Sequence, residues 1–468
     1  MMIVKEIQQA IVPHELFGAL HDRAGSFFLD SAQWAGGLGA YSFIGFDPFL
    51  TFRAKGNRIS VSLDCKESSY SGDSLLELRR LLRQYRSPAH PKLPFSGGAV
   101  GYFSYELCSQ LEGIPRTSVD DLDIPDLEFS FYEGIIACDL ASQRSYLVAN
   151  PVRGTSAEAI IERLEGVVAV ALGRLGGERW KPAGPVAAET PRPNFTKQEY
   201  LQAVERVRDY IRSGDVYQVN LTQRFEAPLT SSPYDLYRNL RERSPASFAC
   251  YLNLGSHQIV GSSPERFLSI KDGRVETRPI KGTRPRGRTP EEDAQLRNEL
   301  ATSAKDRAEL LMIVDLERND LGRVCEFGSI RVDEIFRLES YATVHHLVAT
   351  ITGQLRSGCD VIDCIRAAFP GGSITGAPKI RAMQIIDELE TRRRYGYTGA
   401  VGYLGFDGNC DLNIAIRTIF CLDGRATYHV GGGIVWDSDP EREYQETLDK
   451  GRAMHAVLTG FERRPATP

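Results

Sequence analysis

The sequence predicts an α+β protein built on antiparallel sheets. Two Asp-Gly pairs, Asp272-Gly273 and Asp423-Gly424, each separate two β-like runs, which is the strongest short-range signal for a β-hairpin. Helical stretches alternate with these strand pairs, and hairpins outnumber β-α-β units. At 468 residues the chain has room for about three domains, or for two large ones.

Composition excludes several classes of protein. Hydrophobic residues make up 42% and charged residues 25%, as in ordinary globular proteins. The net charge of −5 argues against a nucleic-acid partner, and the apolar runs are too short to cross a membrane. The start of the chain does not resemble a signal peptide, and the nine cysteines include no Cys-x-x-Cys pair. We therefore expect reduced thiols and a cytoplasmic protein.

The expected elements fall on two sides of a linker. Before it, residues 75–85 and 158–175 have the apolar spacing of helices, while 99–103 and 134–138 are strand-like. The stretch 176–195 is rich in Gly and Pro and has no apolar period, so we expect irregular structure there. It divides a first domain, 1–175, from a second, 196–460. The second domain opens with a helix over 197–213 that ends at Gly214.

The Asp272-Gly273 hairpin brings an acid and an amine to one end of a strand pair. In ideal register Glu265 lies opposite Ile280, and Lys281 lies opposite Pro264. Adjacent strand positions point to opposite faces of a sheet. A bulge or a strand end near Pro264 is therefore needed if both groups are to line one pocket.

The Asp423-Gly424 hairpin places Arg417 opposite Val430, beside Gly431, Gly432 and Gly433. If Asp407-Gly408 is also a tight turn, Tyr397, Arg417 and the glycines meet at one edge of a three-stranded meander; a longer turn there is the alternative. A guanidinium beside exposed backbone N–H groups suits a carboxylate. The competing interpretation is an arginine on a solvated sheet face.

Carboxylates recur at a spacing that suits a metal. Ser438-Asp439-Pro440-Glu441 begins a helix on which Glu443, Glu446 and Lys450 share one face. On a second predicted helix, Asp306 and Glu309 stand three residues apart. Carboxylate oxygens one turn apart can bind a hard cation such as Mg²⁺. Ordinary solvated helix faces remain the alternative.

A glycine-rich segment at 371–379 resembles a phosphate loop but lacks the Gly-Lys-Ser/Thr ending. We expect it to form a tight turn at the start of a helix, with Ser373 facing a ligand. Of the neighbouring His345 and His346, we expect one to be structural and the other to face a pocket.

Together these segments resemble the chorismate-utilising enzymes, which include anthranilate synthase, aminodeoxychorismate synthase component I, and the isochorismate and salicylate synthases. The resemblance covers nearly the whole chain. It implies two interleaved halves whose large antiparallel sheets pack as a β-sandwich flanked by helices. The matching blocks are residues 213–221, 263–267, 279–285, 315–323, 369–383 and 431–450.

Two positions sort the members of this family. Isochorismate and salicylate synthases carry a water-activating lysine where this chain has Gln218, and anthranilate synthase typically carries alanine where this chain has Lys281. The resemblance therefore favours aminodeoxychorismate synthase component I, which makes 4-amino-4-deoxychorismate for p-aminobenzoate and folate synthesis. Anthranilate synthase component I is the alternative. A non-catalytic amino-acid sensor is an alternative from a different class.

The resemblance also implies roles for individual residues. Lys281 would be the nucleophile that bonds to C2 of chorismate, and Glu265 would be the general acid. Mg²⁺ would sit on Glu309, Glu443 and Glu446, with Asp306 near the metal or in its coordination shell. The substrate pocket would comprise Gly282, Thr283, His346, Ser373, Tyr397, Arg417, Gly431, Gly432, Gly433 and Lys450.

Partners follow from the same resemblance. No cysteine lies in the sequence context of a glutaminase nucleophile, so ammonia must come from solution or from a separate glutamine amidotransferase subunit, aminodeoxychorismate synthase component II. In relatives the N-terminal region forms a tryptophan pocket, which here would include Ser31, Tyr41 and Pro245. Asp30 stands where glutamate is common, which argues against regulation by tryptophan.

Overall fold

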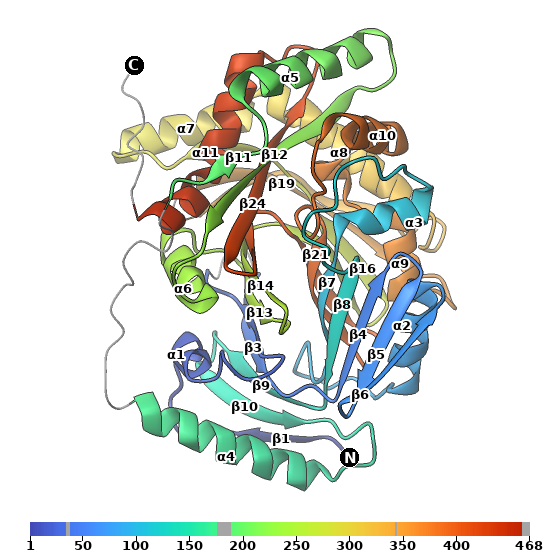
Figure 1. Cartoon of the computed structure of the whole chain (residues 1–468), viewed down its shortest axis with the longest axis vertical. Helices are drawn as coiled ribbons and strands as arrows, with labels where there is room; N and C mark the ends of the chain where they lie inside the picture. The colour runs from blue at the N-terminus through green and yellow to red at the C-terminus, as the bar shows by residue number, and fades with distance from the viewer. Residues whose placement is uncertain (34–37, 176–188, 342–343, 461–468) are drawn as a thin grey trace.

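The computed structural model describes residues 1–33, 38–175, 189–341 and 344–460. Two twelve-stranded sheets form its framework, and both are antiparallel throughout their named strands. Helices flank the sheets (Figure 1). The predicted α+β class is therefore confirmed. None of the described helices is long and apolar enough to cross a membrane.

The first sheet combines strands from both halves of the chain. Its centre joins β2 to β13, with Asp30 opposite Ala249. A short strand, β20, pairs with the beginning of β12. In spatial order the strands are β1 (Ile3–Glu6), β10 (Arg144–Ala149), β9 (Gly134–Asp139), β3 (Tyr41–Gly45), β2 (Phe27–Asp30), β13 (Phe248–Asn253), β14 (His257–Ser263), β23 (Thr418–Leu422), β24 (Arg425–Ile434), β12 (Gln218–Pro228) and β11 (Arg192–Pro193), with β20 (Gly376–Ala377) beside β12.

The second sheet is interleaved in the same way. Its centre joins β21 to β7, with Gly402 opposite Gly101. In spatial order the strands are β17 (Ile280–Pro285), β19 (Val344–Gln354), β16 (Arg274–Arg278), β15 (Arg266–Lys271), β22 (Cys410–Ile414), β21 (Ala400–Gly405), β7 (Gly98–Phe103), β8 (Leu127–Tyr132), β4 (Leu50–Lys55), β5 (Arg58–Leu63) and β6 (Lys66–Ser71), with β18 (Arg331–Ser340) beside β19.

The helices begin at the caps that the sequence provides. Thr196 and Glu199 form a capping box at the start of α5, and Asp439 caps α11 before Pro440. The predicted helices at 75–85, 158–175 and 197–213 are confirmed to within one or two residues. The helices are α1 (Pro13–Gly18), α2 (Ser74–Gln84), α3 (Cys108–Glu112), α4 (Ala157–Leu175), α5 (Lys197–Arg212), α6 (Pro233–Arg243), α7 (Pro290–Thr302), α8 (Ala304–Gly322), α9 (Val361–Ala368), α10 (Lys379–Leu389) and α11 (Pro440–Thr459).

The two sheets pack face to face. Phe43 and Phe420 from the first sheet lie in one buried cluster with Tyr102 and Tyr403 from the second. This arrangement confirms the predicted sandwich of interleaved halves. Residues 176–188 of the predicted linker lie outside the described residues, and Arg192 and Pro193 pair with β12. Both sheets thus join the two predicted domains in space.

Two of the predicted hairpin turns are confirmed, and the predicted meander is not. The turns at Asp272-Gly273 and Asp423-Gly424 are confirmed by the pairs Lys271–Arg274 and Leu422–Arg425. The turn at Asp407-Gly408 is longer, because Gly405 N–H donates to Asn409 O at 2.7 Å. The predicted three-stranded meander is wrong, since β21 and β22 belong to the second sheet while β23 and β24 belong to the first. The chain crosses between the sheets just before β23.

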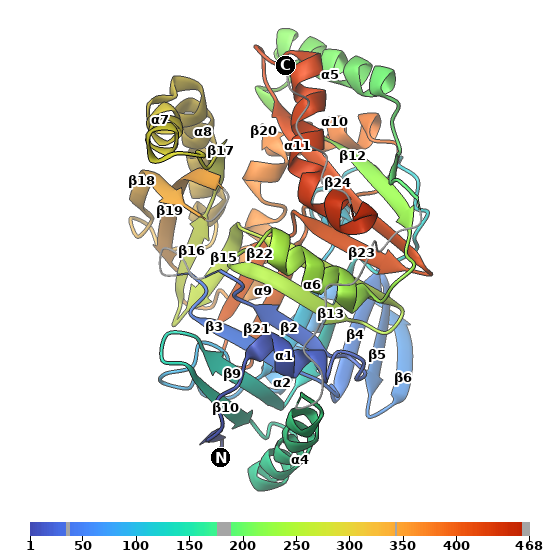
Figure 2. The same cartoon turned by 90° about the vertical axis from the view of Figure 1, so that its left-hand side faces the viewer.

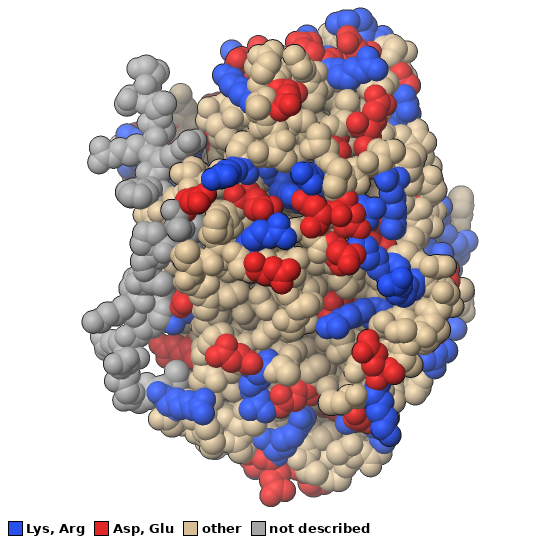
Figure 3. Space-filling model, in the orientation of Figure 1, with Lys and Arg blue, Asp and Glu red and all other residues tan. Residues whose placement is uncertain are grey.

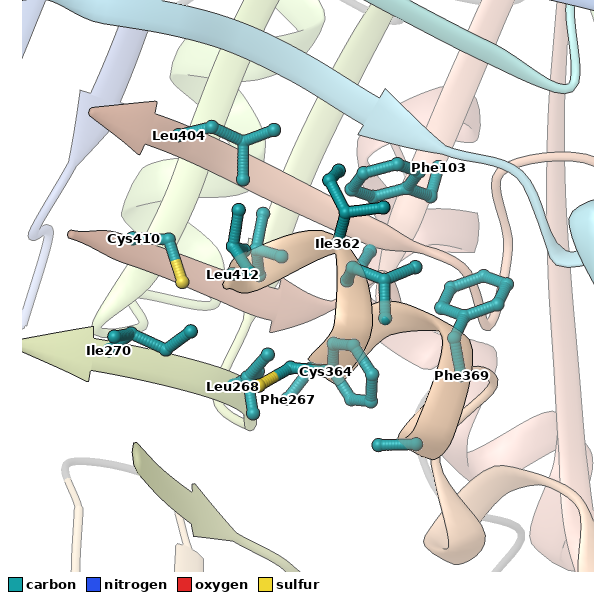
Figure 4. Packing of buried hydrophobic residues seen from close by; sticks show 14 of the residues in the cluster. Phe103, Phe267, Leu268, Ile270, Ile362, Cys364, Phe369, Leu404, Cys410 and Leu412 are labelled. Carbon is teal, nitrogen blue, oxygen red and sulfur yellow. The ribbon is translucent and has the colours of Figure 1, made fainter. Parts of the chain in front are cut away.

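Packing of α9 fixes the glycine-rich segment that follows it. In Figure 4, Ile362 and Cys364 of α9 face the strands that carry Leu268 and Leu412. Phe369 follows α9 and packs edge-on against Phe267, with ring centroids 5.8 Å apart. Because this cluster is buried, the short 3₁₀ turn that begins at Gly372 is held against the second sheet.

Candidate active site

Lys281 and Glu265 meet where the second sheet departs from regular pairing. The β15–β16 register shifts between Arg266 and Ser269, so the predicted irregularity near Pro264 is present. The predicted pairing of Lys281 with Pro264 is wrong, because Lys281 lies on β17 opposite Leu347 of β19, where the register shifts again before Thr283. Glu265 Oε1 accepts hydrogen bonds from Ser373 Oγ at 2.7 Å and from the Ile280 N–H at 3.4 Å. Lys281 Nζ donates to Ser373 O at 3.2 Å. Ser373 therefore links the acid and the amine.

The surroundings bias both groups toward their neutral forms. Burial lowers the pKa of Lys281, and the nearby Lys450 ammonium adds to the effect, while Glu309 and Glu265 oppose it. Burial raises the pKa of Glu265, against the hydrogen bond from Ser373 and the charge of Lys281. A neutral amine can act as a nucleophile, and a protonated carboxyl can act as an acid.

Two glutamates of α11 lie beside Gly432 of β24, and Glu309 of α8 is close enough to feel the charge of one of them, Glu446. A Cβ atom at Gly432 would lie 3.2 Å from Glu443 Oε2 and 3.4 Å from Glu446 Oε1, so glycine leaves room for both carboxylates at the strand. Burial raises the pKa of Glu309 and of Glu443, and the charge of Glu446 adds to both shifts. This mutual repulsion marks an excess of negative charge.

Lys450 lies among these acids. Its Nζ lies 2.7 Å from Glu446 Oε1 and donates to Gly431 O at 3.0 Å. Burial opposes the change, but the ammonium of Lys450 lowers the pKa of Glu446. Because α11 continues to Thr459, Lys450 is not a cation placed at the end of the helix.

The donor set suits a hard cation that keeps other ligands. Across the described ranges, no three His, Cys, Asp or Glu side chains converge closely enough to hold a metal by themselves. Mg²⁺, however, is commonly held by one or two carboxylates together with water and substrate oxygens. The repelling carboxylates of Glu309, Glu443 and Glu446 fit that pattern, and they are the residues that would hold it.

Asp306 lies beside the site but has a partner of its own. Its Oδ2 accepts from Arg284 Nη2 at 3.0 Å. A Cβ at Gly282 would lie 2.9 Å from Asp306 Cγ, and Gly282 has a left-handed backbone with φ of +74°. Gly282 therefore lets the bulge pack against α8.

Thr283 and His346 form a pair on neighbouring strands. Thr283 Oγ1 and His346 Nδ1 are 2.9 Å apart. Burial and the charge of Arg417 lower the pKa of His346 to about 3, so the imidazole is neutral. His346 Nε2 is buried without a hydrogen-bond partner, whereas His345 bonds to Ser340 and Asp293. His345 therefore has structural partners, and a pocket-facing role for His346 stays a prediction.

Arg417 occupies the crossing between the two sheets, with a left-handed backbone at φ of +49°. In the described part of the chain, no carboxylate lies within ion-pair distance of its guanidinium. Tyr397 stacks on His429 of β24, with ring centroids 5.1 Å apart. Tyr397 thus approaches the glycine strand by ring stacking, and the predicted meander edge plays no part.

The sequence reading missed a buried ion pair behind the site. Arg394, with 1% of its surface exposed, donates to both oxygens of Glu390 at 2.6 and 2.8 Å. It also donates to Asn220 O at 2.6 Å and to Ile374 O at 3.1 Å. The i,i+4 spacing of Glu390 and Arg394 was visible, but it also describes common surface pairs. Lys305, whose charge acts on Glu309 and Glu443, was missed as well.

The residues of the predicted tryptophan pocket lie on or next to three neighbouring central strands of the first sheet, β3, β2 and β13. Ser31 Oγ donates to Tyr41 O at 2.6 Å, and Pro245 shortly precedes β13, which pairs with β2. The neighbouring Asp30 accepts from Tyr237 at 2.8 Å and from Arg241 at 2.6 Å. Tryptophan binding stays a prediction.

Comparison with known proteins identifies the family. A model of chorismate binding enzymes matches residues 25–456, so the chain belongs to that family. It is 40% identical over 421 residues to aminodeoxychorismate synthase component 1 of Bacillus subtilis (strain 168), covering 90% of this chain and 89% of the relative. It is 37% identical to anthranilate synthase component 1 of Acetivibrio thermocellus, covering 94% and 92%.

A solved structure agrees with the fold. Anthranilate synthase component I from Streptococcus pneumoniae TIGR4 superposes with a TM-score of 0.78 at 33% identity, covering 89% of this chain and 92% of that one. The chain is therefore a chorismate-utilising enzyme and corresponds to the large subunit of its named relatives. Relatives with two different reactions match at similar identity, so the reaction must be argued from the site.

Proposed function

We propose that this enzyme aminates chorismate at C4 with ammonia, giving 4-amino-4-deoxychorismate for p-aminobenzoate and folate synthesis in the cytoplasm. One observation supports this choice above the others. Lys281 holds a largely buried amine whose pKa is lowered, beside a carboxyl whose pKa is raised. The named aminodeoxychorismate synthase relatives add support.

In the proposed first step, the neutral amine of Lys281 bonds to C2 of the ring. The diene shifts, and the C4–O bond breaks. The departing hydroxyl takes the proton of Glu265 and leaves as water. The new secondary amine gives its extra proton to the Glu265 carboxylate, so that the enzyme is linked to the ring through Nζ and Glu265 is protonated again.

In the second step, ammonia bonds to C4 and the C2–Nζ bond breaks as the diene shifts back. Glu265 gives a proton to Nζ, so that Lys281 leaves as a neutral amine, and the new C4 ammonium returns a proton to Glu265. The enolpyruvyl group stays on the product. The overall change consumes chorismate and ammonia and releases the amino product and water. A separate lyase is needed to form p-aminobenzoate.

The remaining site residues bind and orient the substrate. Arg417, which has no acidic ion-pair partner in the described ranges, would bind the enolpyruvyl carboxylate with the backbone of Gly432 and Gly433. Tyr397 and His346 would line the ring, and Ser373 would keep Lys281 and Glu265 in register. Bound Mg²⁺, held by Glu309, Glu443 and Glu446, would supply positive charge for the ring carboxylate.

A product assay tests the proposal. The purified chain is incubated with chorismate, an ammonium salt and Mg²⁺, and the products are separated before and after addition of aminodeoxychorismate lyase. We expect p-aminobenzoate to appear only after the lyase is added. Anthranilate and pyruvate without lyase would instead establish anthranilate synthase component 1, which the 37% identical relative favours. Amino-acid binding without any turnover would establish the sensor.

A further inference from the structure

Lys305 is an exposed cation beside the glutamates of the candidate site, and none of the proposed steps involves it. Its side chain is 60% exposed, and its Nζ lies 3.9 Å from Glu309 Oε1, one turn further along α8. This separation is too long for a hydrogen bond, so the ammonium is attracted to Glu309 without being fixed to it. Lys305 therefore keeps its charge and its freedom to move.

The local structure of α8 does not account for a lysine at this position. Ser303 caps the helix by accepting from the N–H of Asp306, so Lys305 lies in the first turn. The partial positive charge at a helix N-terminus favours acids and disfavours cations. The adjacent Asp306 follows that rule and accepts from Arg284 of β17. What explains Lys305 is therefore the set of charges that faces it from outside its own helix.

The charge of Lys305 reaches glutamates on two helices. α8 packs against β19 of the second sheet, and α11 packs against β24 of the first (Figure 2). Burial raises the pKa of Glu309 and of Glu443, and the charge of Lys305 opposes both shifts. For Glu446, Lys305 adds to the effect of Lys450, which lowers the pKa against burial. The three carboxylates proposed to hold Mg²⁺ therefore lie within range of one loosely held ammonium.

Lys450, the other lysine among these acids, is held more tightly than Lys305. Its Nζ lies 2.7 Å from Glu446 Oε1 and donates to Gly431 O at 3.0 Å. A bound anion could draw Lys450 away only by breaking that hydrogen bond and that ion pair. Lys305 can move toward an anion without breaking a hydrogen bond.

Glu443 is also fixed in place. Ser438 Oγ donates to Glu443 Oε1 at 2.6 Å and accepts from the N–H of Val435 at 3.0 Å. These bonds tie the carboxylate to the turn that carries Trp436. The acids of the site are therefore held by the framework, and the lysine at its side is the part that can adjust.

The charges of the proposed site leave a place for this ammonium. Glu309, Glu443 and Glu446, when ionised, carry three negative charges, and the ring carboxylate of chorismate adds a fourth. Mg²⁺ supplies two positive charges and Lys450 a third, so one negative charge stays unbalanced where burial makes that costly. On the face that Figure 3 draws, acidic and basic side chains are interspersed, so no broad positive surface there offsets it. Lys305 can supply the fourth positive charge.

We propose that Lys305 exchanges partners when the substrate binds: it balances Glu309 in the free enzyme and pairs with the ring carboxylate of chorismate once the glutamates hold Mg²⁺. This inference rests on the magnesium site of the proposed function, and it does not depend on which amination product the enzyme releases. An ammonium at this position repels Mg²⁺ and attracts the substrate. Its removal should therefore change the two affinities in opposite directions.

Calorimetry with two probes tests the exchange. Mg²⁺ alone is titrated into the chain at alkaline pH, where the glutamates are ionised. Chorismate is then titrated at saturating Mg²⁺ without ammonia, in the Lys281→Ala background so that no covalent bond forms. For Lys305→Met we expect the Kd for Mg²⁺ to fall about threefold and the Kd for chorismate to rise about tenfold. Both changes should shrink in high salt, because Lys305 is exposed.

Lys305→Arg and Arg318→Met are the matched controls. Arginine keeps the charge, so Lys305→Arg should leave both Kd values within about twofold of those of the wild type. Arg318 lies on the same helix, has a side chain that is 51% exposed and pairs with Asp315 at 3.0 Å. Arg318→Met should change neither Kd.

A loss of both affinities in Lys305→Met would show a general effect on the site and overturn the exchange. Unchanged Kd values would also overturn it. A wild type that binds no Mg²⁺ would overturn this inference together with the proposed metal site. A wild type that shows the exchange but releases anthranilate would contradict the proposed product and support the role of Lys305.

Discussion

The structure holds two largely buried lysines whose surroundings differ sharply. At the start of α10, Lys379 Nζ donates to Asp320 Oδ2 at 2.5 Å and to Ala368 O at 2.9 Å. At the candidate site, Lys281 Nζ donates to a neutral carbonyl, Ser373 O, at 3.2 Å. The first lysine neutralises an acid and joins two segments. The second keeps its amine available for chemistry.

Two arginines repeat the contrast. Arg394 is surrounded by acceptors that include both oxygens of Glu390, whereas Arg417 has no acidic partner among the described residues. Burial lowers the pKa of Arg417, with Glu265 opposing. Paired charges hold the framework together, and unpaired charges mark the place where a charged substrate would bind. Substitution of a paired charge should therefore lower stability, and substitution of an unpaired charge should lower activity.

Lys281→Ala should give the largest loss of activity. Without the amine no covalent bond to C2 forms, so we expect kcat for amination to fall by at least about 10³-fold. The midpoint of thermal unfolding should not fall, because no carboxylate among the described residues forms an ion pair with this amine and the variant removes a buried polar group. Steady-state product formation and calorimetry measure the two effects. An unchanged rate would exclude the covalent mechanism.

Lys379→Ala is the matched control for this lysine. Its side chain is 10% exposed and its partner Asp320 is 11% exposed, so the variant leaves a buried carboxylate unpaired. We expect a loss of roughly 3–5 kcal/mol in the free energy of unfolding. Denaturant titration measures it. The folded fraction should still turn over chorismate.

Glu265→Gln should come next, with a loss of kcat of about 10²–10⁴-fold. The pH profile gives the sharper test. Burial lowers the pKa of Lys281, so activity should rise with pH as the amine deprotonates. Burial raises the pKa of Glu265, so activity should fall as pH passes that value and the acid is lost. Glu265→Gln should abolish the falling limb and keep the rising one. A retained falling limb would assign the acid elsewhere.

Arg417→Met should raise KM for chorismate while changing stability little. Charge-assisted hydrogen bonds contribute about 1.5–3 kcal/mol, which corresponds to roughly 10–150-fold in KM. The corresponding change at Arg394→Met should cost about 3–5 kcal/mol of unfolding free energy, because Glu390 is left buried and unpaired. If both variants altered stability equally, the contrast between the two arginines would be lost.

Local patterns predicted the parts of the site that depend on local geometry. The turn at Asp272-Gly273 and the need for a bulge brought Glu265 and Lys281 together, and helical spacing placed Glu443 and Glu446 on one face. The crossing at Arg417 could not be predicted, because an Asp-Gly pair specifies a turn and not the sheet that its strands join. The burial of Arg394 depends on tertiary packing, and the i,i+4 spacing of Glu390 and Arg394 carries no information about it.

The smallest expected effect concerns Ser438, which ties the turn of Trp436 to Glu443. Burial raises the pKa of Glu443, and the hydrogen bond from Ser438 lowers it. Ser438→Ala should therefore raise that pKa further, and a protonated carboxyl cannot hold a cation. The Mg²⁺ concentration for half-maximal activity should rise about tenfold at acidic pH and return to the wild-type value at alkaline pH.

Ser232→Ala separates this effect from a general loss of stability. Ser232 caps α6, where its Oγ accepts from the N–H of Asp235 at 3.1 Å, so its removal should cost about 1 kcal/mol of unfolding free energy and leave the Mg²⁺ requirement unchanged. A Mg²⁺ requirement that shifts equally at every pH in Ser438→Ala would mean that Ser438 acts through the shape of the turn. In that case Ser438 would affect the site by holding the turn that carries Trp436, and its hydrogen bond would have a negligible effect on the pKa of Glu443.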